Sequence, residues 1–143
     1  MRGVLLGLDY GRKRIGIAVS TPLGTVHPRP RIERRAVEAD LAALGALARE
    51  AEAEGFVLGL PSHMDGSLSP MESEVRAFAA SLAGATGLPV YGSDERLTSE
   101  AADSALGAQD LSRAARKGRR DSAAACIILA DFLASAAPPE RLA

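Results

Sequence analysis

The first twenty residues constrain the fold most, because they join two apolar stretches through a short charged turn. Residues 3–9 read GVLLGLD, an almost continuous apolar run typical of a central strand buried on both faces. Residues 10–14, YGRKR, predict a polar turn, and residues 15–20, IGIAVS, alternate in size as a hairpin partner would. The chain therefore opens a sheet with Asp9 at the end of a buried strand, where a carboxylate costs stability unless something binds it.

The remaining sequence alternates between strand and helix patterns. Residues 25–32 are extended, and their prolines favour a sheet edge. Helical periodicity runs from about residue 36 to residue 54, with Gly55 as its expected stop. A second helix is expected to start at Pro70 after a Ser69 cap, between short buried strands over 56–61 and 90–95.

The last third predicts two more helices separated by a loop. Thr98 or Ser99 can cap a helix over residues 100–106. Residues 107–120 are polar, basic and glycine-bearing, which indicates a mobile loop that substrate could order. The closing helix is expected to begin at Asp121 as its N-cap.

These segments follow the order β-β-β-α-β-α-β-α-α. The order predicts an α/β fold with a five-stranded mixed sheet, a three-strand meander plus two parallel strands, flanked by helices. Residues 1–137 are expected to form one domain and residues 138–143 a frayed tail.

Composition narrows the function. The net charge of −1 argues against a protein that coats nucleic acid non-specifically, and the two Tyr, three Phe and no Trp limit base stacking. The single cysteine, Cys126, suits a reducing cytosol. There is neither a signal-peptide pattern nor an apolar run near the ~20 residues that span a bilayer, so we expect a cytoplasmic protein without membrane contact.

Acidic residues fall where ligands collect, outside the carboxyl ends of parallel strands. Asp9 ends the first strand, Asp94 and Glu95 end the last strand, and Asp121 starts the closing helix. Each acid alone could be a solvated group or a helix cap. As a set they would repel one another unless a hard cation lay between them. Oxygen ligands favour Mg²⁺ or Mn²⁺, and two such ions about 3.5–4 Å apart can clamp a phosphodiester and activate water.

Cations surround these acids in the sequence. The candidate substrate-binding cations are Arg12, Lys13, Arg14, Arg96, Lys117, Arg119 and Arg120. A carboxylate centre surrounded by cations is suited to binding a nucleic-acid backbone, because phosphates are bound through their charge without contacts to the bases. A second basic cluster, Arg29, Arg31, Arg34 and Arg35, is interpreted as solvated surface charge.

Four segments of the chain resemble the YqgF (RuvX) family, in order and at suitable spacing. They read LGLDYGRKRIGIAVS, VLGLPSHMDGS, SDERLTSEAA and KGRRDSAAACIIL. The resemblance implies an RNase H-like fold, as in RuvC-type resolvases, and a metal-dependent nuclease. Carried over by position, it implies that Asp9, Glu95 and Asp121 are catalytic metal ligands. Asp94 would either be a ligand or orient a neighbour.

Several neighbouring residues keep two interpretations. Gly11 either lets the backbone approach a ligand or is an ordinary hairpin glycine. Arg96 either binds phosphate or fixes the preceding glutamate in a bidentate pair. Tyr10 is expected to pack against its turn, His63 to lie in a surface loop and Thr98 to cap a helix rather than to catalyse.

The substrate stays open between two nucleic acids. Members of the family are described as nucleases that process the 5′ end of the 16S ribosomal RNA precursor, which is the favoured substrate, and as Holliday junction resolvases. A resolvase would act as a homodimer on two strands. A non-catalytic RNase H-like module that binds structured nucleic acid is a further alternative. An actin-like nucleotide binder would need two lobes, and 143 residues supply one.

Overall fold

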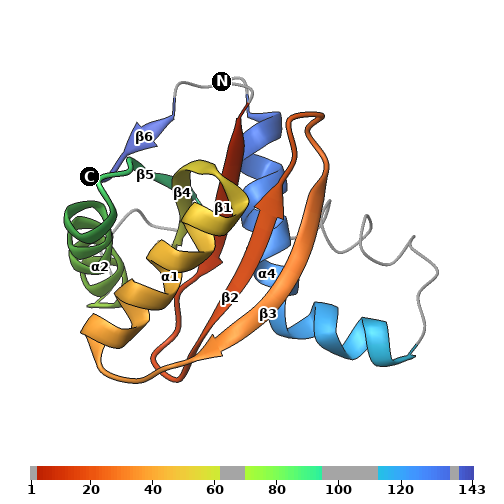
Figure 1. Ribbon diagram of the computed structural model, residues 1–143, viewed down its shortest axis with the longest axis horizontal. Helices are drawn as coiled ribbons and strands as arrows, with labels where there is room; N and C mark the ends of the chain where they lie inside the picture. The colour runs from red at the N-terminus through yellow and green to blue at the C-terminus, as the bar shows by residue number, and fades with distance from the viewer. Residues whose placement is uncertain (1–2, 62–69, 95–112, 136–138) are drawn as a thin grey trace.

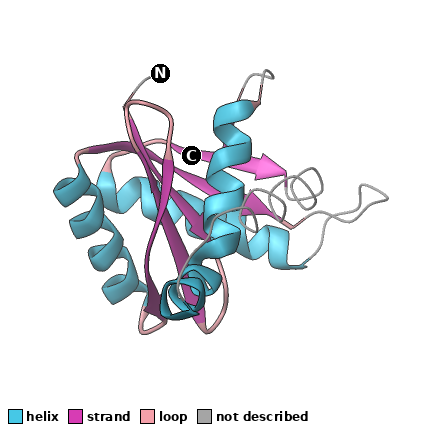
Figure 2. Cartoon of the chain, turned by 90° about the vertical axis from the view of Figure 1, so that its right-hand side faces the viewer, coloured by secondary structure: helices cyan, strands magenta, loops and turns pink. Residues whose placement is uncertain are grey.

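A six-stranded mixed sheet lies between two helical layers in the computed structural model, which describes residues 3–61, 70–94, 113–135 and 139–143 (Figures 1 and 2). The strands are β1 (Val4–Asp9), β2 (Arg14–Ser20), β3 (Val26–Glu33), β4 (Ala53–Leu60), β5 (Val90–Asp94) and β6 (Glu140–Arg141). The helices are α1 (Val37–Ala51), α2 (Pro70–Thr86) and α4 (Arg113–Ala134). None of these helices is long and apolar enough to cross a membrane.

The sheet has the order β3-β2-β1-β4-β5-β6. β1, β2 and β3 form an antiparallel meander, while β4 runs parallel to β1 and β5 parallel to β4. The predicted α/β, RNase H-like arrangement is therefore confirmed. Leu8 pairs with Leu58 and Leu60 with Asp94, so the carboxyl ends of the three parallel strands share one edge of the sheet.

The sheet has six strands where five were expected, because the tail predicted to fray adds β6. Its backbone pairs with β5: the Val90 N–H donates to the Ala143 carbonyl (2.9 Å), and the Leu142 N–H donates to the Val90 carbonyl (2.7 Å). Arg76 of α2 also forms an ion pair with Glu140 at 3.1 Å. The tail is ordered because it satisfies backbone groups along β5 that would otherwise form an open edge.

Helix α1 ends at Ala51, earlier than Gly55 predicted. Glu52 stops the helix in a left-handed conformation (φ 55°, ψ 44°), an unusual choice for a residue with a side chain. Gly55 lies inside β4, where a Cβ would stand 3.0 Å from the Pro89 carbonyl oxygen. Close packing between neighbouring segments, rather than helix termination, therefore favours glycine at this position.

Helix α4 begins at Arg113, so residues 113–120 are helical where a loop was expected. Asp121 consequently lies within the helix and is not its N-cap. Alanine, arginine and lysine are strong helix formers, and they outweigh the glycine at position 118. Residues 107–112 and the helix expected over 100–106 lie outside the described residues.

The two faces of the sheet pack against different helices, as period-two alternation requires. Leu6 and Leu8 of β1 belong to the apolar cluster that includes α1 and α2, whereas Leu5 packs with Ala125 and Leu129 of α4. Gly7 of β1 lies directly under α4, because a Cβ at this position would stand 2.7 Å from the Leu129 Cβ. Helix α4 thus lies directly on β1, on the face to which the odd-numbered residues of this strand belong.

Candidate active site at the carboxyl edge of the sheet

Asp9 is the last residue of β1 and occupies the strand face covered by α4. The residue is partly buried, and burial raises the pKa of its carboxyl group. Among the side chains that the structure describes, no cation offsets this desolvation. The Asp9 carboxylate is therefore a suitable ligand for a divalent metal ion, whose positive charge would favour the ionised form.

Helix α4 reaches the same edge through Ser122. Its hydroxyl accepts a hydrogen bond from the Ile17 N–H (3.2 Å) and donates one to the Arg29 carbonyl (2.6 Å). Ile17 directly follows Gly16, which is the register partner of Asp9 in β2. The backbone position of Asp121, one residue before Ser122, is therefore brought near Asp9.

The other predicted acids are placed less completely. Asp94 ends β5, which is separated from β1 by β4, so its backbone lies at the predicted edge. The side chains of Asp94 and Asp121 and the whole of Glu95 lie outside what the structure describes. Within the described part of the chain, no three potential metal-binding side chains come together.

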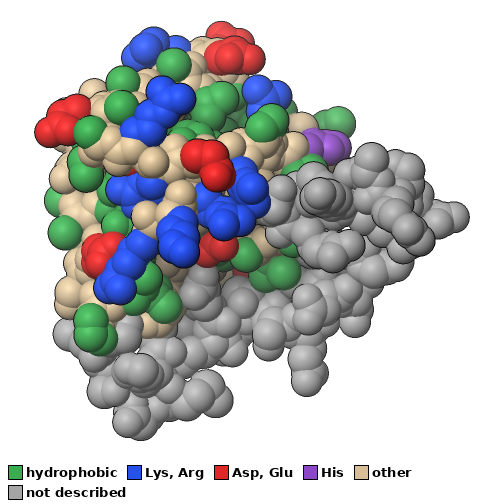
Figure 3. All heavy atoms as spheres, turned by 90° about the horizontal axis from the view of Figure 1, so that it is seen from below, with side chains coloured by type: hydrophobic (Ala, Val, Ile, Leu, Met, Phe, Trp, Pro, Cys, Tyr) green, Lys and Arg blue, Asp and Glu red, His purple; other side chains and the backbone are tan. Residues whose placement is uncertain are grey.

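Three cations follow Asp9 at this edge, two in the turn and one at the start of β2. Arg12, Lys13 and Arg14 are exposed, and Figure 3, which views the molecule from below, shows Lys and Arg side chains gathered on this face. Arg12 also forms an ion pair with Glu74 of α2 (Nε to Oε1, 3.1 Å). A Cβ at Gly11 would stand 2.6 Å from the Arg14 carbonyl oxygen, so the tight turn itself requires glycine.

Arg34 holds this turn in place, a role that the sequence interpretation missed. The Arg34 Nη1 group donates to the Gly11 carbonyl (2.9 Å), and the Arg34 backbone N–H donates to the Lys13 carbonyl (2.9 Å). Its Nε donates to Asp40 Oδ2 at 2.7 Å, and the Asp40 side chain is only 1% exposed. Arg34 is therefore a half-buried connection between the turn and α1, and its interpretation as solvated surface charge was wrong.

One signal in the sequence could have revealed this contact. Asp40 stands four residues before Leu44 and eight before Ala48, so it lies on the buried stripe of α1. An acid on an apolar stripe needs a partner. The two arginines just before the helix were the nearest candidates in the sequence.

Tyr10 was expected to pack against its turn, but its ring and hydroxyl contact residues of α2. Its ring lies 4.9 Å from the Phe78 ring, and the Arg34 guanidinium carbon lies 4.9 Å from the Tyr10 ring centre. The Tyr10 hydroxyl donates to Glu74 Oε2 at 2.6 Å. This hydrogen bond lowers the pKa of Glu74, while burial raises the pKa of Tyr10.

The remaining predicted site residues are not placed. His63, Arg96 and Thr98 lie outside the described residues, as do the side chains of three cations on α4: Lys117, Arg119 and Arg120. Their roles stay predictions.

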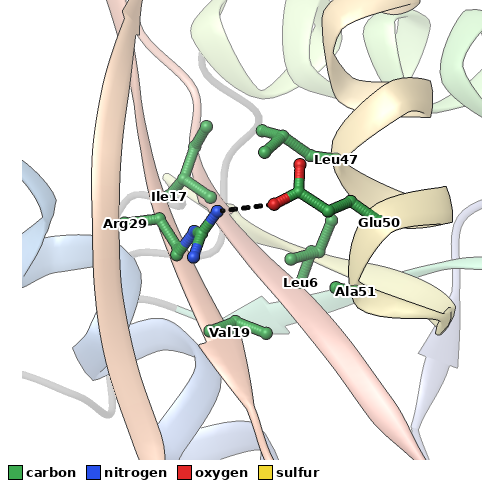
Figure 4. A pocket seen from close by; sticks show the side chains of 7 residues that line it. All are labelled: Leu6, Ile17, Val19, Arg29, Leu47, Glu50 and Ala51. Carbon is green, nitrogen blue, oxygen red and sulfur yellow. Dashed lines mark ion pairs between the residues drawn. The ribbon is translucent and has the colours of Figure 1, made fainter.

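A small cavity of about 140 Å³ lies on the other face of the sheet, against α1 (Figure 4). It is lined by Leu6, Ile17, Val19, Arg29, Leu47, Glu50 and Ala51. Arg29 and Glu50 form an ion pair across it at 3.6 Å. Ligand pockets usually measure about 300–1,000 Å³, so this cavity is too small to hold a nucleotide.

Comparison with known proteins finds one matching family model and similar sequences that cover nearly the whole chain. The family model described as "RuvX: Holliday junction resolvase" matches residues 3–135. A protein of Moorella thermoacetica named "Putative pre-16S rRNA nuclease" is 48% identical over 130 residues, covering 90% of this chain and 93% of that protein. A protein of Symbiobacterium thermophilum with the same name is 44% identical over 137 residues, covering 94% and 95%.

A solved structure shows the same fold at low sequence identity. Thermus thermophilus RuvC, in complex with a Holliday junction substrate, superposes with a TM-score of 0.57 at 15% identity. The match covers 90% of this chain and 91% of RuvC. At this identity the likeness establishes the fold alone.

Proposed function

Because the chain belongs to the RuvX family of Holliday junction resolvases, we propose that it is a metal-dependent nuclease that processes the 5′ end of the 16S ribosomal RNA precursor in the cytoplasm. The curated relatives that match nearly the whole chain support this substrate by their names. The observation that carries the proposal is Asp9, a partly buried carboxylate at the carboxyl edge of parallel strands whose desolvation no described cation offsets.

Asp9, Glu95 and Asp121 would hold the metal, either Mg²⁺ or Mn²⁺ and with two ions in the complete centre. Asp9 is fixed by the β1 backbone, and Asp121 is carried to the same edge by α4. The bound ions would polarise the scissile phosphate and lower the pKa of an attacking water molecule.

The alternation of β5 supports one of the two roles considered for Asp94. Val90 packs with the α1 and α2 cluster, whereas Tyr91 packs against the α4 cluster. Strand position 94 therefore shares the face of Val90, opposite to the face that Asp9 occupies. This favours Asp94 as a residue that orients its neighbour and favours Glu95 as the ligand.

The surrounding cations would bind phosphates on either side of the cleaved bond. Arg12, Lys13 and Arg14 project from the turn that directly follows Asp9. Arg96, Lys117, Arg119 and Arg120 belong to the same proposal from their sequence positions. Phosphate contacts of this kind position a backbone without reading sequence.

Holliday junction resolution is the second candidate function, because the family description names that activity. It would require a homodimer with two centres, since both strands must be cut symmetrically. The processing of an RNA end requires one centre only.

One experiment separates these functions. The pure protein, with Mn²⁺ or Mg²⁺, is given a labelled four-way DNA junction and a labelled RNA carrying the 5′ leader of the 16S precursor. Cleavage of the RNA alone supports the proposal, whereas paired symmetric nicks in the junction alone support the resolvase. Binding without cleavage of either substrate would indicate the non-catalytic module. Asp9→Asn is the control for a contaminating nuclease.

A further inference from the structure

Ser122 occupies an unusual place between a helix and a sheet. Its side chain is fully buried, although it carries a hydroxyl group. The hydroxyl lies between the Ile17 N–H and the Arg29 carbonyl, two groups on residues that are register partners in β2 and β3. The register of these strands is irregular between Ile15 and Ile17, beside this contact.

The bridge fixes α4 to the sheet next to the residue that would carry a metal ligand. Ile17 follows Gly16, the register partner of Asp9, and Ser122 follows Asp121. A displacement of α4 along or away from the sheet would therefore change the spacing between the backbones that carry the two acids. Both hydrogen bonds resist such a displacement, because the buried Ile17 N–H and the part-buried Arg29 carbonyl would each lose this partner.

We propose that Ser122 is a positioning residue for the metal centre: its hydroxyl anchors α4 to the β2–β3 pair so that Asp121 is held opposite Asp9. This inference rests on the proposed metal-dependent function and adds a residue to it. Ser122 touches neither metal nor substrate in this scheme. It acts through the backbone that carries Asp121.

The chain contains a matched control in Ser20. Ser20 is also buried, and its hydroxyl also contacts one backbone N–H and one carbonyl. Both groups belong to Leu5: the hydroxyl accepts from the Leu5 N–H (2.8 Å) and donates to the Leu5 carbonyl (3.4 Å). Leu5 and Ser20 lie at the end of the β1–β2 pair that is opposite to Asp9. Replacing either serine with alanine removes a buried hydroxyl, but only Ser122→Ala does so beside the proposed site.

The test compares Ser122→Ala and Ser20→Ala for stability and for metal binding. Stability is measured by denaturant unfolding in EDTA. Metal binding is measured by a calorimetric titration of the folded protein, whose Mn²⁺ midpoint is the free concentration that half-saturates it. Both variants should lose stability. Ser122→Ala should raise the Mn²⁺ midpoint by about 10- to 100-fold, as loss of a supporting contact around a metal site typically does. Ser20→Ala should leave the midpoint unchanged.

Two further variants keep the result decisive. Ser122→Thr retains the hydroxyl and should keep the wild-type midpoint, which tests the bridge even if Ser122→Ala folds poorly. A wild-type midpoint in Ser122→Ala, or equal shifts in both alanine variants, would overturn the positioning role. The metal centre itself is tested separately by Asp9→Asn. If Mn²⁺ fails to raise the Tm of the wild type, the proposed function fails together with this inference.

Discussion

The ionised carboxyl group of Asp9 destabilises the fold in which it is partly buried. Burial raises the pKa of its carboxyl group, so the folded chain binds that proton more tightly than the unfolded chain does. The stabilising effect of protonation is complete below the ordinary pKa of aspartate and is lost as the pH rises through the raised value. At neutral pH without metal, the ionised Asp9 therefore lowers the free energy of unfolding.

Asp9→Asn should consequently be more stable than the wild type in EDTA at pH 7. The difference in Tm should shrink as the pH falls through the acidic range, because the wild-type carboxyl then becomes protonated. Mn²⁺ should raise the Tm of the wild type and not that of the variant. Thermal unfolding followed by circular dichroism measures all three effects, and a lower Tm of the variant in EDTA would contradict the account.

Arg34→Ala should be strongly destabilising, because it leaves the buried Asp40 carboxylate without its ion-pair partner. Breaking a buried pair from one side typically costs about 3–5 kcal/mol, and the partial exposure of Arg34 favours the lower end. Denaturant unfolding measures the loss. The neighbouring Arg35 is exposed and contacts Asp40 through its backbone N–H, so Arg35→Ala should change stability by about 0.5 kcal/mol or less. Equal losses would show that the Arg34 side chain does not anchor the turn.

At the scale of secondary-structure elements, α4 packs closely on β1. This packing depends on Gly7, where a methyl group would meet the Leu129 Cβ at 2.7 Å and the Ala125 carbonyl at 3.0 Å. The contact is made by backbone and Cβ atoms, which cannot move aside as a flexible side chain could.

Gly7→Ala should therefore destabilise the protein by about 1–3 kcal/mol, the usual range for overpacking a core. Gly84 provides the control, since it is exposed in α2 and nothing lies within 4 Å of the Cβ that alanine would add. Gly84→Ala should be neutral or stabilise by up to about 1 kcal/mol, because alanine has the higher helix propensity. Urea unfolding of both variants checks the contrast. A neutral Gly7→Ala would mean that α4 does not lie tightly on β1.

The sequence predicted the elements that carry a long, regular pattern. The apolar run of β1, the size alternation of β2 and the prolines of β3 all indicated strands that the structure contains. The α1 stripe was also visible, but its end was not, because Glu52 adopts a conformation that residue preferences assign to glycine. β6 was missed because two residues carry no periodicity and are ordered only by pairing with β5.

For the candidate site, the sequence predicted the edge of the sheet at which it lies, but not the contacts that hold the neighbouring turn and helix in place. Asp9 lies where strand order and composition placed it. The Arg34–Asp40 pair and the Ser122 bridge depend on contacts between segments far apart in the chain, which local patterns do not encode. The α4 start was missed because the basic residues before Asp121 were interpreted as a loop, although most of them favour helix.

At the scale of the whole molecule, a net charge of −1 coexists with a cationic edge. Binding to a polyanion should therefore depend on a few local cations rather than on the total charge. Each phosphate contact contributes to the salt dependence of the binding constant, by about 0.7 in the log–log slope for a single strand.

Lys13→Ala should reduce this slope by roughly that amount for a single-stranded RNA and weaken binding regardless of sequence. Arg49→Ala is the matched control, because Arg49 is an exposed cation in the last turn of α1, outside the turn that follows Asp9. Fluorescence anisotropy across a range of salt concentrations gives both slopes. If the two variants show the same slope as the wild type, the turn after Asp9 does not contact the backbone.

The Ser122 bridge has a consequence for the order in which the protein is made. Its two hydrogen bonds join residues that are 105 and 93 positions apart in the chain. A ribosome that has produced the first three strands has not yet produced the helix that meets them. The proposed metal centre needs residues from both parts, so it would assemble only after α4 has been synthesised and has packed on the strands.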